Sequence, residues 1–456
     1  MTETMDQFDF VIIGAGAGGE AAAFKARKRG ASVAIVDRDL FGGSCPFWAC
    51  MPSKTLLHAA GVHAVGGDYD WHHAAARRDY MINREERDYP DDSGHVKGLE
   101  KAGATVIRGE AHIVGPGRVQ VRTADVAREL TTKNIVVATG SVSKIPDLEG
   151  LADVQPWTNR EATSTEELPA SLLVLGGGPT GVELAQVFAR YDVPTAVVEH
   201  NRRLLARDHP RNSEAVEAGL RRDGVTIRTG VRAVRARAHA GPDGAHAIDL
   251  DDGTTATGHE VMVAIGRDFR LEGLGLDSLG IDPSKRDGIP HDGRLRIADG
   301  LFIIGDPAGP ELHTHVAHYQ GEMAVRMALG DDIRPDYRAL PRATYTDPEA
   351  AFVGVSLEEA QAAGSDAFEL VQDLATTAKG YVAEASGHVT IIVDRATRTL
   401  IGAAMAGPAA SEVIHEAVLA IKTSTPIDVL ADTIHAFPTA ARVLGSLFAE
   451  AAEKLA

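Results

Sequence analysis

The two cysteines are the residues of this chain best suited to chemistry. Cys45 and Cys50 are the only cysteines among 456 residues, and four residues separate them. Two cysteines placed at random in so long a chain rarely fall this close, which favours a reactive dithiol over two small core residues. Lys54 follows Cys50 by one helical turn. The stretch 42–54, GGSCPFWACMPSK, is therefore the first candidate for a reactive site.

The composition limits what such a dithiol does. With 44% hydrophobic and 24% charged residues, the chain predicts a globular protein of several domains. No apolar run approaches the roughly 18 residues that a membrane span needs, and residues 1–7 are too polar for a signal peptide, so we expect a cytoplasmic protein. Structural disulfides do not normally persist there, which favours a catalytic or redox role for the pair. The net charge of −18 argues against nucleic acid or an anionic membrane as partner.

A nucleotide-binding pattern precedes the cysteines. The apolar run Asp9–Ile13 predicts a buried strand, a glycine-rich stretch follows, and Glu20–Arg29 predicts a helix. The next apolar run, Ser32–Val36, ends on Asp37, 18 residues after Gly19 (37 − 19). This strand–helix–strand context indicates a dinucleotide site, in which the acid accepts a hydrogen bond from a ribose hydroxyl.

Each glycine of the pattern has a physical task. Gly14 permits the tight turn, Gly16 lets the backbone approach a pyrophosphate, and Gly19 allows helix and strand to pack. The amide groups at the start of the helix are the donors for the phosphates.

The same unit recurs in the middle of the chain. The run Leu172–Leu175 leads into Gly176, Gly178 and Gly181, a predicted helix over Val182–Arg190, and a strand over Thr195–Val198 that ends on Glu199. The acid again lies 18 residues after the last glycine (199 − 181). Two copies predict two bound dinucleotides.

Three later strands complete the pattern. The run at 135–140 ends on Thr139 and Gly140 and belongs with the first copy, whereas the run at 261–266 ends on Gly266 and belongs with the second. The run Leu301–Ile304 leads to Asp306, where a ligand hydroxyl would be held. A helix cap is the alternative role for Asp306.

Together these motifs resemble the two-dinucleotide flavoprotein disulfide reductases, the family of dihydrolipoamide dehydrogenase, glutathione reductase and mercuric reductase. In that family the first glycine motif holds FAD, the second holds NAD(P)H, and GGxCxxxxCxPSK carries a redox disulfide. The resemblance spans essentially the whole chain, including Thr346–Glu349 and Gly407–Glu412 in the region that resembles the family's dimerisation domain.

The resemblance implies an α/β fold and a homodimer. We expect two Rossmann-like domains, one for FAD and one for NAD(P)H, and a C-terminal α+β dimerisation domain. The FAD domain is expected to be split into 1–150 and 268–338, the NAD(P)H domain to cover 151–267 and the dimerisation domain to cover 339–456.

The resemblance also implies roles for individual residues. Cys50 is expected against the flavin as the charge-transfer thiolate, Cys45 is the outer thiol that attacks a disulfide or other small-molecule acceptor, and Lys54 pairs with Glu183. The residues expected at FAD are Gly14, Gly16, Gly19, Asp37, Gly43, Ser44, Lys54, Ala111, Thr139, Gly140, Asp306, His313 and Thr314. Those expected at NAD(P)H are Gly176, Gly178, Gly181, Glu199 and Gly266, and no metal site is expected.

Two local predictions refine this picture. Glu199 favours NADH, because a carboxylate repels a 2′-phosphate, although Arg202 and Arg203 offset part of that repulsion and leave NADPH possible. Pro46 suits the first position of a helix whose positive end lowers the thiol pKa. The helix must be irregular between Cys45 and Cys50, because five residues of an ideal helix put the sulfurs on different faces.

The sharpest departure from the family lies near the C-terminus. Disulfide reductases carry His-Pro-Thr-x-x-Glu there, whereas this chain has Phe437 at the histidine and Arg442 at the glutamate. A phenyl ring cannot accept a proton, so a general base worth about 10² to 10⁴ in rate is missing at that position. His435 lies two residues earlier, and both a substitute base and a structural histidine are open roles for it.

Several functions fit this departure. Mercuric reductase also has Phe-Pro here, but this chain lacks a C-terminal cysteine pair, which disfavours mercury as substrate. This chain resembles ketopropyl-coenzyme M carboxylase in its GGSCPxxAC pattern and in the phenylalanine that replaces the base, so reductive carboxylation is an alternative function. A flavin diaphorase and a thiol redox sensor are two others. We further hypothesise that Phe47 and Trp48 form a dry pocket with Phe437, and that Arg442 attracts an anionic substrate or stabilises a thiolate, a surface contact being its other role.

Overall fold

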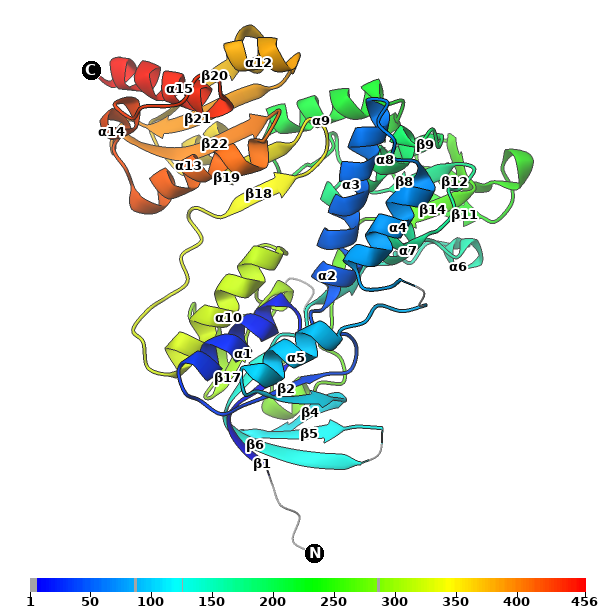
Figure 1. The fold of residues 1–456 in the computed structure, drawn as a ribbon, viewed down its shortest axis with the longest axis vertical. Coiled ribbons are helices and arrows are strands. Elements are labelled where there is room, and N and C mark those ends of the chain that lie inside the picture. The colour runs from blue at the N-terminus through cyan, green and yellow to red at the C-terminus, as the bar shows by residue number, and fades with distance from the viewer. Residues whose placement is uncertain (1–5, 86–87, 125, 285–287) are drawn as a thin grey trace, which may run out of the picture. The chain divides into compact units, whose positions relative to one another are not determined.

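The computed structural model describes residues 6–85, 88–124, 126–284 and 288–456. The chain divides into two compact units (Figure 1). The first unit comprises Met1–Pro52, Ala76–Lys144 and Arg267–Pro335, and the second comprises Ser53–Ala75, Ile145–Gly266 and Asp336–Ala456. The three domain boundaries given above stay a prediction.

A largely parallel sheet forms the core of the first unit. Its strand order is β16-β17-β6-β1-β2-β3, with the hairpin strands β4 and β5 attached through β6. The bounds are β1 Asp6–Ile13, β2 Val33–Asp37, β3 Thr105–Arg108, β4 Glu110–Gly115, β5 Arg118–Arg122, β6 Ala127–Val137, β16 Arg296–Ala298 and β17 Leu301–Ile303. Strands β1, β2, β3, β6 and β17 pair in parallel, so their carboxyl ends meet at one edge of the sheet.

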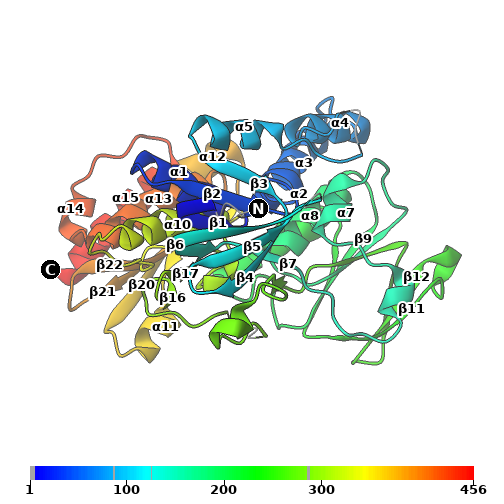
Figure 2. The same cartoon turned by 90° about the horizontal axis from the view of Figure 1, so that it is seen from below.

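Two helices cross closely beside this sheet. Helix α1 (Ala17–Lys28) lies against α10 (Thr314–Ala328), and both views of the ribbon show them side by side (Figures 1 and 2). A Cβ at Gly321 would overlap the carbonyl oxygen of Gly18, so the backbones approach as closely as two glycines allow. Helices α2 (Ser44–Trp48) and α5 (Ser93–Lys101) also belong to this unit, α3 (Cys50–Ala64) and α4 (Trp71–Met81) cross its boundary, and β7 (Ser141–Ser143) pairs with β15 (Arg267–Phe269).

The second unit repeats the first sheet in a shorter form. Its parallel sheet has the order β10-β9-β8-β14, which matches β3-β2-β1-β6 strand for strand, and a three-stranded antiparallel sheet, β11-β12-β13, accompanies it. The strands are β8 Leu172–Leu175, β9 Thr195–Glu199, β10 Thr226–Thr229, β11 Ala233–Arg237, β12 His246–Leu250, β13 Thr255–Gly258 and β14 Glu260–Val263, and the helices are α6 Leu151–Val154, α7 Asn159–Ser164, α8 Pro179–Arg190 and α9 Pro210–Arg222.

The C-terminal part of the second unit is an antiparallel sheet with helices on both faces. Its order is β18-β19-β22-β21-β20. Alternate residues of β19 face different neighbours: Ala351 and Val353 pack with α13 and α15, whereas Ala350 packs in the core that contains α8 and α9. The bounds are β18 Pro341–Thr344, β19 Ala350–Gly354, β20 Ala367–Asp373, β21 His388–Asp394, β22 Thr399–Ala406, α11 Leu357–Ala362, α12 Ala378–Ala383, α13 Ala410–Thr423, α14 Ile427–Ala431 and α15 Ala440–Leu455.

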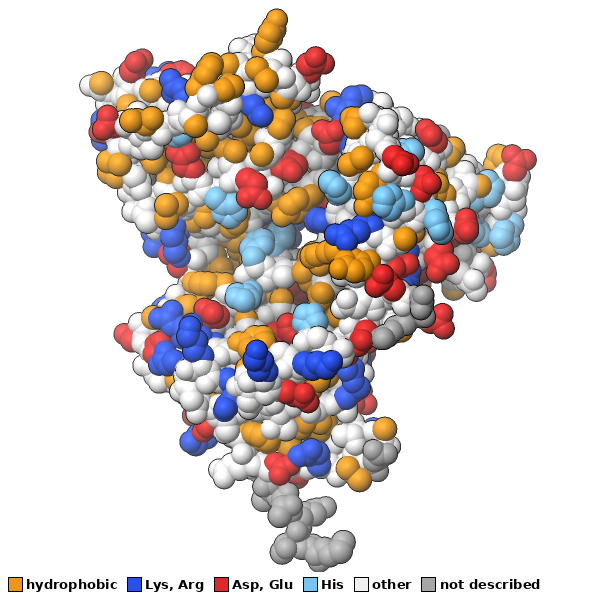
Figure 3. All heavy atoms as spheres, in the orientation of Figure 1, with side chains coloured by type: hydrophobic (Ala, Val, Ile, Leu, Met, Phe, Trp, Pro, Cys, Tyr) orange, Lys and Arg blue, Asp and Glu red, His pale blue; other side chains and the backbone are white. Residues whose placement is uncertain are grey.

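The fold therefore contains the two predicted Rossmann-like sheets and the predicted C-terminal α+β region. Figure 3 shows hydrophobic side chains on the surface over α13 and α15. Within the described ranges, every helix is too short or too polar to cross a bilayer.

Candidate functional site

The first glycine loop has the geometry predicted for a pyrophosphate cradle. Gly14 has φ +104°, and a side chain at Gly19 would overlap the Gly14 carbonyl. Gly16 caps α1 without a side-chain hydrogen bond, so the first amide groups of the helix are left for another acceptor. A Cβ at Gly43 would lie 2.7 Å from the Gly16 Cα, which brings the loop against the turn before Cys45.

Asp37 closes this loop from the end of β2. One carboxylate oxygen accepts from the Ala15 N–H at 2.7 Å, and the other accepts from the Asp39 N–H at 2.8 Å. Burial raises the pKa of Asp37, and these two hydrogen bonds oppose the rise. The acid therefore also shapes the loop, a role that the ribose hypothesis did not include.

The second loop is built in the same way. Gly176 has φ +114°, a side chain at Gly181 would overlap the Gly176 carbonyl, and Gly178 caps α8 without a side-chain hydrogen bond. Nothing lies within 4 Å of a Cβ built on Gly178, so this position is open toward a ligand. Glu199, at the end of β9, accepts from the Gly177 N–H at 2.5 Å, as Asp37 does from Ala15.

Only one of the two arginines after Glu199 is exposed. Arg203 donates to the carbonyl oxygens of Leu205, Ala206 and Asp208 at 2.8–2.9 Å, so its guanidinium holds the chain that leads into α9. Arg202 is exposed. These contacts occupy donors of Arg203, and the expectation that the two arginines offset part of the charge of Glu199 stays a prediction.

Groups on the first unit's other strands fit the predicted FAD site. The buried Thr139 Oγ1 has no hydrogen-bond partner among the described residues, and an unsatisfied hydroxyl at the end of β6 fits a bound ligand. Ser141 donates to Asp306, and Arg267 donates to the Ser141 hydroxyl at 2.5 Å. Gly305 rather than Asp306 is the N-cap of the short 3₁₀ turn there, so the cap alternative for Asp306 is wrong.

Four other expected cofactor residues lie on a strand, between strands or at the start of a helix. Ala111 is a buried residue of β4, Gly140 and Gly266 have positive φ with nothing within 4 Å of a Cβ, and Ser44 is the first residue of α2. Their contact with FAD or NAD(P)H stays a prediction.

The cysteine stretch is irregular where the sequence requires it to be. Helix α2 ends at Trp48, Ala49 leaves the helical region with φ −130° and ψ −94°, and α3 begins at Cys50. The predicted irregularity between the cysteines is thus confirmed. Helix α2 begins at Ser44, so Pro46 is its third residue, and the prediction of Pro46 at the first position is wrong. A proline nitrogen costs no hydrogen bond at either position, because both lie in the first turn.

Each cysteine is half-buried, and Cys50 faces α10. Its sulfur lies 3.4 Å from the Thr314 hydroxyl, at the first residue of that helix. His313 is the N-cap residue, and its ring stacks on His315 with 5.0 Å between centroids. The structure thus brings together Cys50 and Thr314, which the sequence links only through the family pattern.

Phe47 and Trp48 lie in a small core cluster with Leu40 and Ile82, and their exposed fractions are 1% and 6%. Phe47 meets His95 edge-on at 5.6 Å, and Trp48 lies 5.5 Å from Tyr89. These contacts give the two rings a different role from the predicted pocket with Phe437, because they anchor α2 within its own unit.

Lys54 and Glu183 form the predicted ion pair in the second unit. The Lys54 Nζ lies 2.7 Å from a Glu183 carboxylate oxygen, and the Glu183 side chain is 5% exposed. A pair this buried on one side differs from a freely solvated surface pair, which is worth little. Sequence reasoning missed Tyr345, whose ring lies 4.7 Å from the Lys54 nitrogen. Its position directly before the Thr346–Glu349 motif was the available indication.

The residues around the position predicted to lack the histidine base differ in exposure. His435 is held between the Glu416 carboxylate at 2.8 Å and the Thr433 carbonyl at 2.9 Å, and its side chain is 5% exposed. A Cβ at Gly445 would overlap the His435 ring, so the glycine makes room for it on α15. Phe437 is 73% exposed, and Arg442 is exposed in the first turn of α15. This environment supports the structural role for His435.

Comparisons with known proteins agree with this geometry. The family model described as pyridine nucleotide-disulphide oxidoreductase matches residues 8–321, and the model of its dimerisation domain matches residues 340–447. The chain is 32% identical to dihydrolipoyl dehydrogenase of Chlorobaculum tepidum over 95% of its length and 94% of that protein. It is 28% identical to mercuric reductase of Staphylococcus aureus over 96% of its length and 81% of that protein.

Solved structures have the same fold. LpdA from Mycobacterium tuberculosis superposes with a TM-score of 0.87 at 26% identity, over 99% of this chain and 100% of that one. The HOCl-induced flavoprotein disulfide reductase RclA from Escherichia coli, solved as a Cu(II) complex, superposes with a TM-score of 0.86 at 24% identity, over 98% of this chain and 100% of that one.

Proposed function

Because this chain belongs to the pyridine nucleotide-disulphide oxidoreductase family, we propose that it carries electrons from NADH through FAD to the Cys45–Cys50 pair and on to an acceptor that needs no histidine base. The observation that carries this proposal is the site around residue 437. Phe437 has no proton-accepting atom, and His435, two residues earlier in the sequence, already contacts Glu416 and Thr433.

The residues of the first unit fit FAD. The Gly14–Gly19 loop, the uncapped start of α1 and the unsatisfied Thr139 hydroxyl are the groups that would hold it. In the second unit the loop that contains Gly178 and the start of α8 would hold the nicotinamide dinucleotide. When bound, the two cofactors supply the pair of electrons that reduces a disulfide.

The two cysteines then reduce an acceptor disulfide in three steps. Two electrons and two protons break the Cys45–Cys50 sulfur–sulfur bond and give two thiols. The Cys45 thiolate attacks an acceptor disulfide and releases one acceptor sulfur as a thiolate. Cys50 attacks Cys45 in the resulting mixed disulfide, which releases the second acceptor sulfur and restores the disulfide. Before this attack, Cys50 can share a hydrogen bond with Thr314.

The surroundings of Glu199 support NADH as the coenzyme. The carboxylate is buried and disfavours a 2′-phosphate. Arg203, which was expected to offset that charge, is engaged with three carbonyl oxygens instead. A homodimer is part of the same proposal, because residues 340–447 match the family's dimerisation domain.

Anaerobic titration with NADH followed by an acceptor screen tests this function. We expect the first two electrons to produce the long-wavelength absorption that a cysteine thiolate gives beside oxidised flavin, and Cys45→Ser to abolish turnover with disulfide acceptors. Bleaching of the flavin without that absorption would refute the dithiol route. Full activity of Cys45→Ser with quinones or metal ions would identify a diaphorase. Incorporation of carbon dioxide would identify the carboxylase, and slow turnover with every acceptor would identify a redox sensor.

A further inference from the structure

The Lys54–Glu183 pair has a third member. Glu183 places one carboxylate oxygen 2.7 Å from the Lys54 nitrogen, and its other oxygen accepts from the Tyr345 N–H at 3.0 Å. The Tyr345 ring lies under the same ammonium group, with 4.7 Å between nitrogen and ring centroid. Tyr345 therefore contacts both charged groups: its backbone N–H donates to the Glu183 carboxylate, and its ring contacts the Lys54 ammonium group.

An aromatic ring in this place restricts the lysine. The Lys54 side chain is 34% exposed, so the ion pair alone leaves the flexible stem room to move. A cation over a ring face is attracted by the ring quadrupole, which adds a second directional contact. Both contacts restrict where the ammonium group lies.

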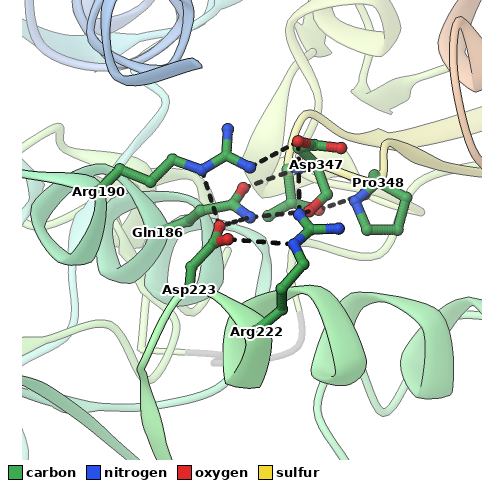
Figure 4. Close-up of polar contacts among 7 residues, drawn as sticks. Gln186, Arg190, Arg222, Asp223, Asp347 and Pro348 are labelled. Atoms are coloured by element: carbon green, nitrogen blue, oxygen red, sulfur yellow. Dashed lines mark hydrogen bonds and ion pairs between the residues drawn. The ribbon is translucent and has the colours of Figure 1, made fainter. Parts of the chain in front are cut away.

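Asp347, two residues after Tyr345, is held by Gln186 of α8 (Figure 4). The Asp347 N–H donates to the Gln186 side-chain oxygen at 2.7 Å, and the Asp347 carbonyl accepts from the Gln186 amide nitrogen at 2.9 Å. Gln186 is fully buried on α8, one helical turn after Glu183. One helix thus holds the backbone at both residues, Glu183 at Tyr345 and Gln186 at Asp347.

Charged side chains also connect Asp347 to α8. Arg190, one turn further along α8, donates to the Asp347 carboxylate at 2.5 Å and to Asp223 at 2.7 Å. Asp223 also accepts from Gln186 at 2.8 Å (Figure 4). The Asp223 and Arg190 side chains are only 11% and 9% exposed, so water screens their ion pair weakly, whereas the Asp347 side chain is 63% exposed.

We propose that Tyr345 is a positioning residue for Lys54, and that Gln186 and Arg190 clamp the segment 345–347 to α8 so that the Tyr345 ring stays against the ammonium group. This inference rests on the proposed function and on the place at FAD that the family resemblance implies for Lys54. It assigns Tyr345 no contact with substrate or reacting atoms.

Comparing Tyr345→Leu with Tyr345→Phe in the FAD-loaded enzyme distinguishes an effect of losing the aromatic ring from an effect on folding. The residue is 41% exposed, so neither substitution empties a core. We expect Tyr345→Leu to lower kcat by about tenfold with KM for NADH unchanged, and to weaken the thiolate–flavin absorption, because the lysine loses its ring contact. Tyr345→Phe keeps the ring and should retain both properties.

The clamp is tested by Gln186→Leu, with Arg222→Gln as its matched control. Arg222 touches the same Asp347 carbonyl at 3.0 Å from a side chain that is 52% exposed. We expect Gln186→Leu to reproduce the Tyr345→Leu spectrum and Arg222→Gln to leave it unchanged.

The outcomes distinguish the two proposals. If the wild-type enzyme shows the absorption and Lys54→Met removes it, while Tyr345→Leu leaves the absorption and kcat unchanged, the positioning role is wrong and the proposed function stands. If the wild-type enzyme shows no such absorption, the proposed function itself fails.

Discussion

Phe437 and Arg442 are the two residues that we propose replace the family's histidine base and its orienting glutamate. Both are exposed, and neither contributes to a core that a substitution would disrupt. The double variant Phe437→His with Arg442→Glu supplies a base and its orienting acid. We expect NADH-dependent lipoamide reduction to rise by roughly 10², the lower end of what a positioned base contributes.

Arg442→Glu alone is the control for this gain. It adds the acid without a ring nitrogen, and we expect no more activity than the parent protein shows. If restoring both residues leaves lipoamide turnover unchanged, the missing base is not what limits the reaction. The kcat and kcat/KM for lipoamide, measured across pH, decide the matter.

Glu199 combines a negative charge with hydrogen bonds, one oxygen accepting from Gly177 and the other from the backbone and side chain of Asn201. Glu199→Gln keeps an oxygen that can accept from the Gly177 N–H and removes the negative charge. We therefore expect the ratio of kcat/KM for NADPH to that for NADH to rise by about tenfold, with the fold intact. Steady-state kinetics with both coenzymes measure this ratio. Arg203→Gln provides the comparison, because Arg203 binds carbonyl oxygens and should leave the ratio unchanged.

At the scale of elements, α9 packs on the C-terminal sheet through a buried histidine. The His388 ring contacts Asn212 of α9 and Thr390 of its own strand, both at 2.9 Å. Burial, together with the neighbouring His209 and Arg211, lowers the pKa of His388 to about 3. The unfolded chain takes up this proton near pH 6.5, so acidification below that pH favours the unfolded state.

His388→Gln removes this proton uptake. Between pH 6.5 and 5 the wild-type chain should lose about 2 kcal/mol more stability than the variant, from about 1.4 kcal/mol per pH unit for one group. The measurement is the midpoint of thermal unfolding at a series of pH values. His415, exposed on α13, provides the control: His415→Gln should keep the wild-type pH dependence. Equal pH dependence in wild type and His388→Gln would contradict this account.

The elements that position the site were largely predictable from the sequence. The predicted strand and helix patterns around Gly14 and Gly176 lie within a residue or a few of β1, α1, β8 and α8, because glycine spacing and buried strands are local properties. The surroundings of individual side chains were not. The five residues of α2 are too few for a periodicity to show that Phe47 and Trp48 are buried. Likewise, the space that Gly445 leaves for His435 depends on folding.

At the scale of the whole molecule, the chain forms two parallel sheets with matching strand orders, and a region that matches a dimerisation domain follows them. That region exposes large apolar side chains, Ile434 at 97% and Leu419 at 64%. We predict a dimer of twice 48.2 kDa in solution, and we expect Ile434→Glu to weaken it because a charge would be buried at the contact. Light scattering after gel filtration measures the mass. Val65→Glu, which alters a residue that is 85% exposed and lies outside the dimerisation-domain match at 340–447, should leave the mass unchanged.

The carboxylate that ends β2 and the one that ends β9 have a shared kinetic consequence. Asp37 and Glu199 already bond to the amides of Ala15 and Gly177 in their own glycine loops, so each loop is closed by the protein itself. An incoming dinucleotide then loses little affinity to the entropy of ordering the loop, because the loop is preorganised. Association should accordingly proceed in a single concentration-dependent phase, without a slower phase for loop closure.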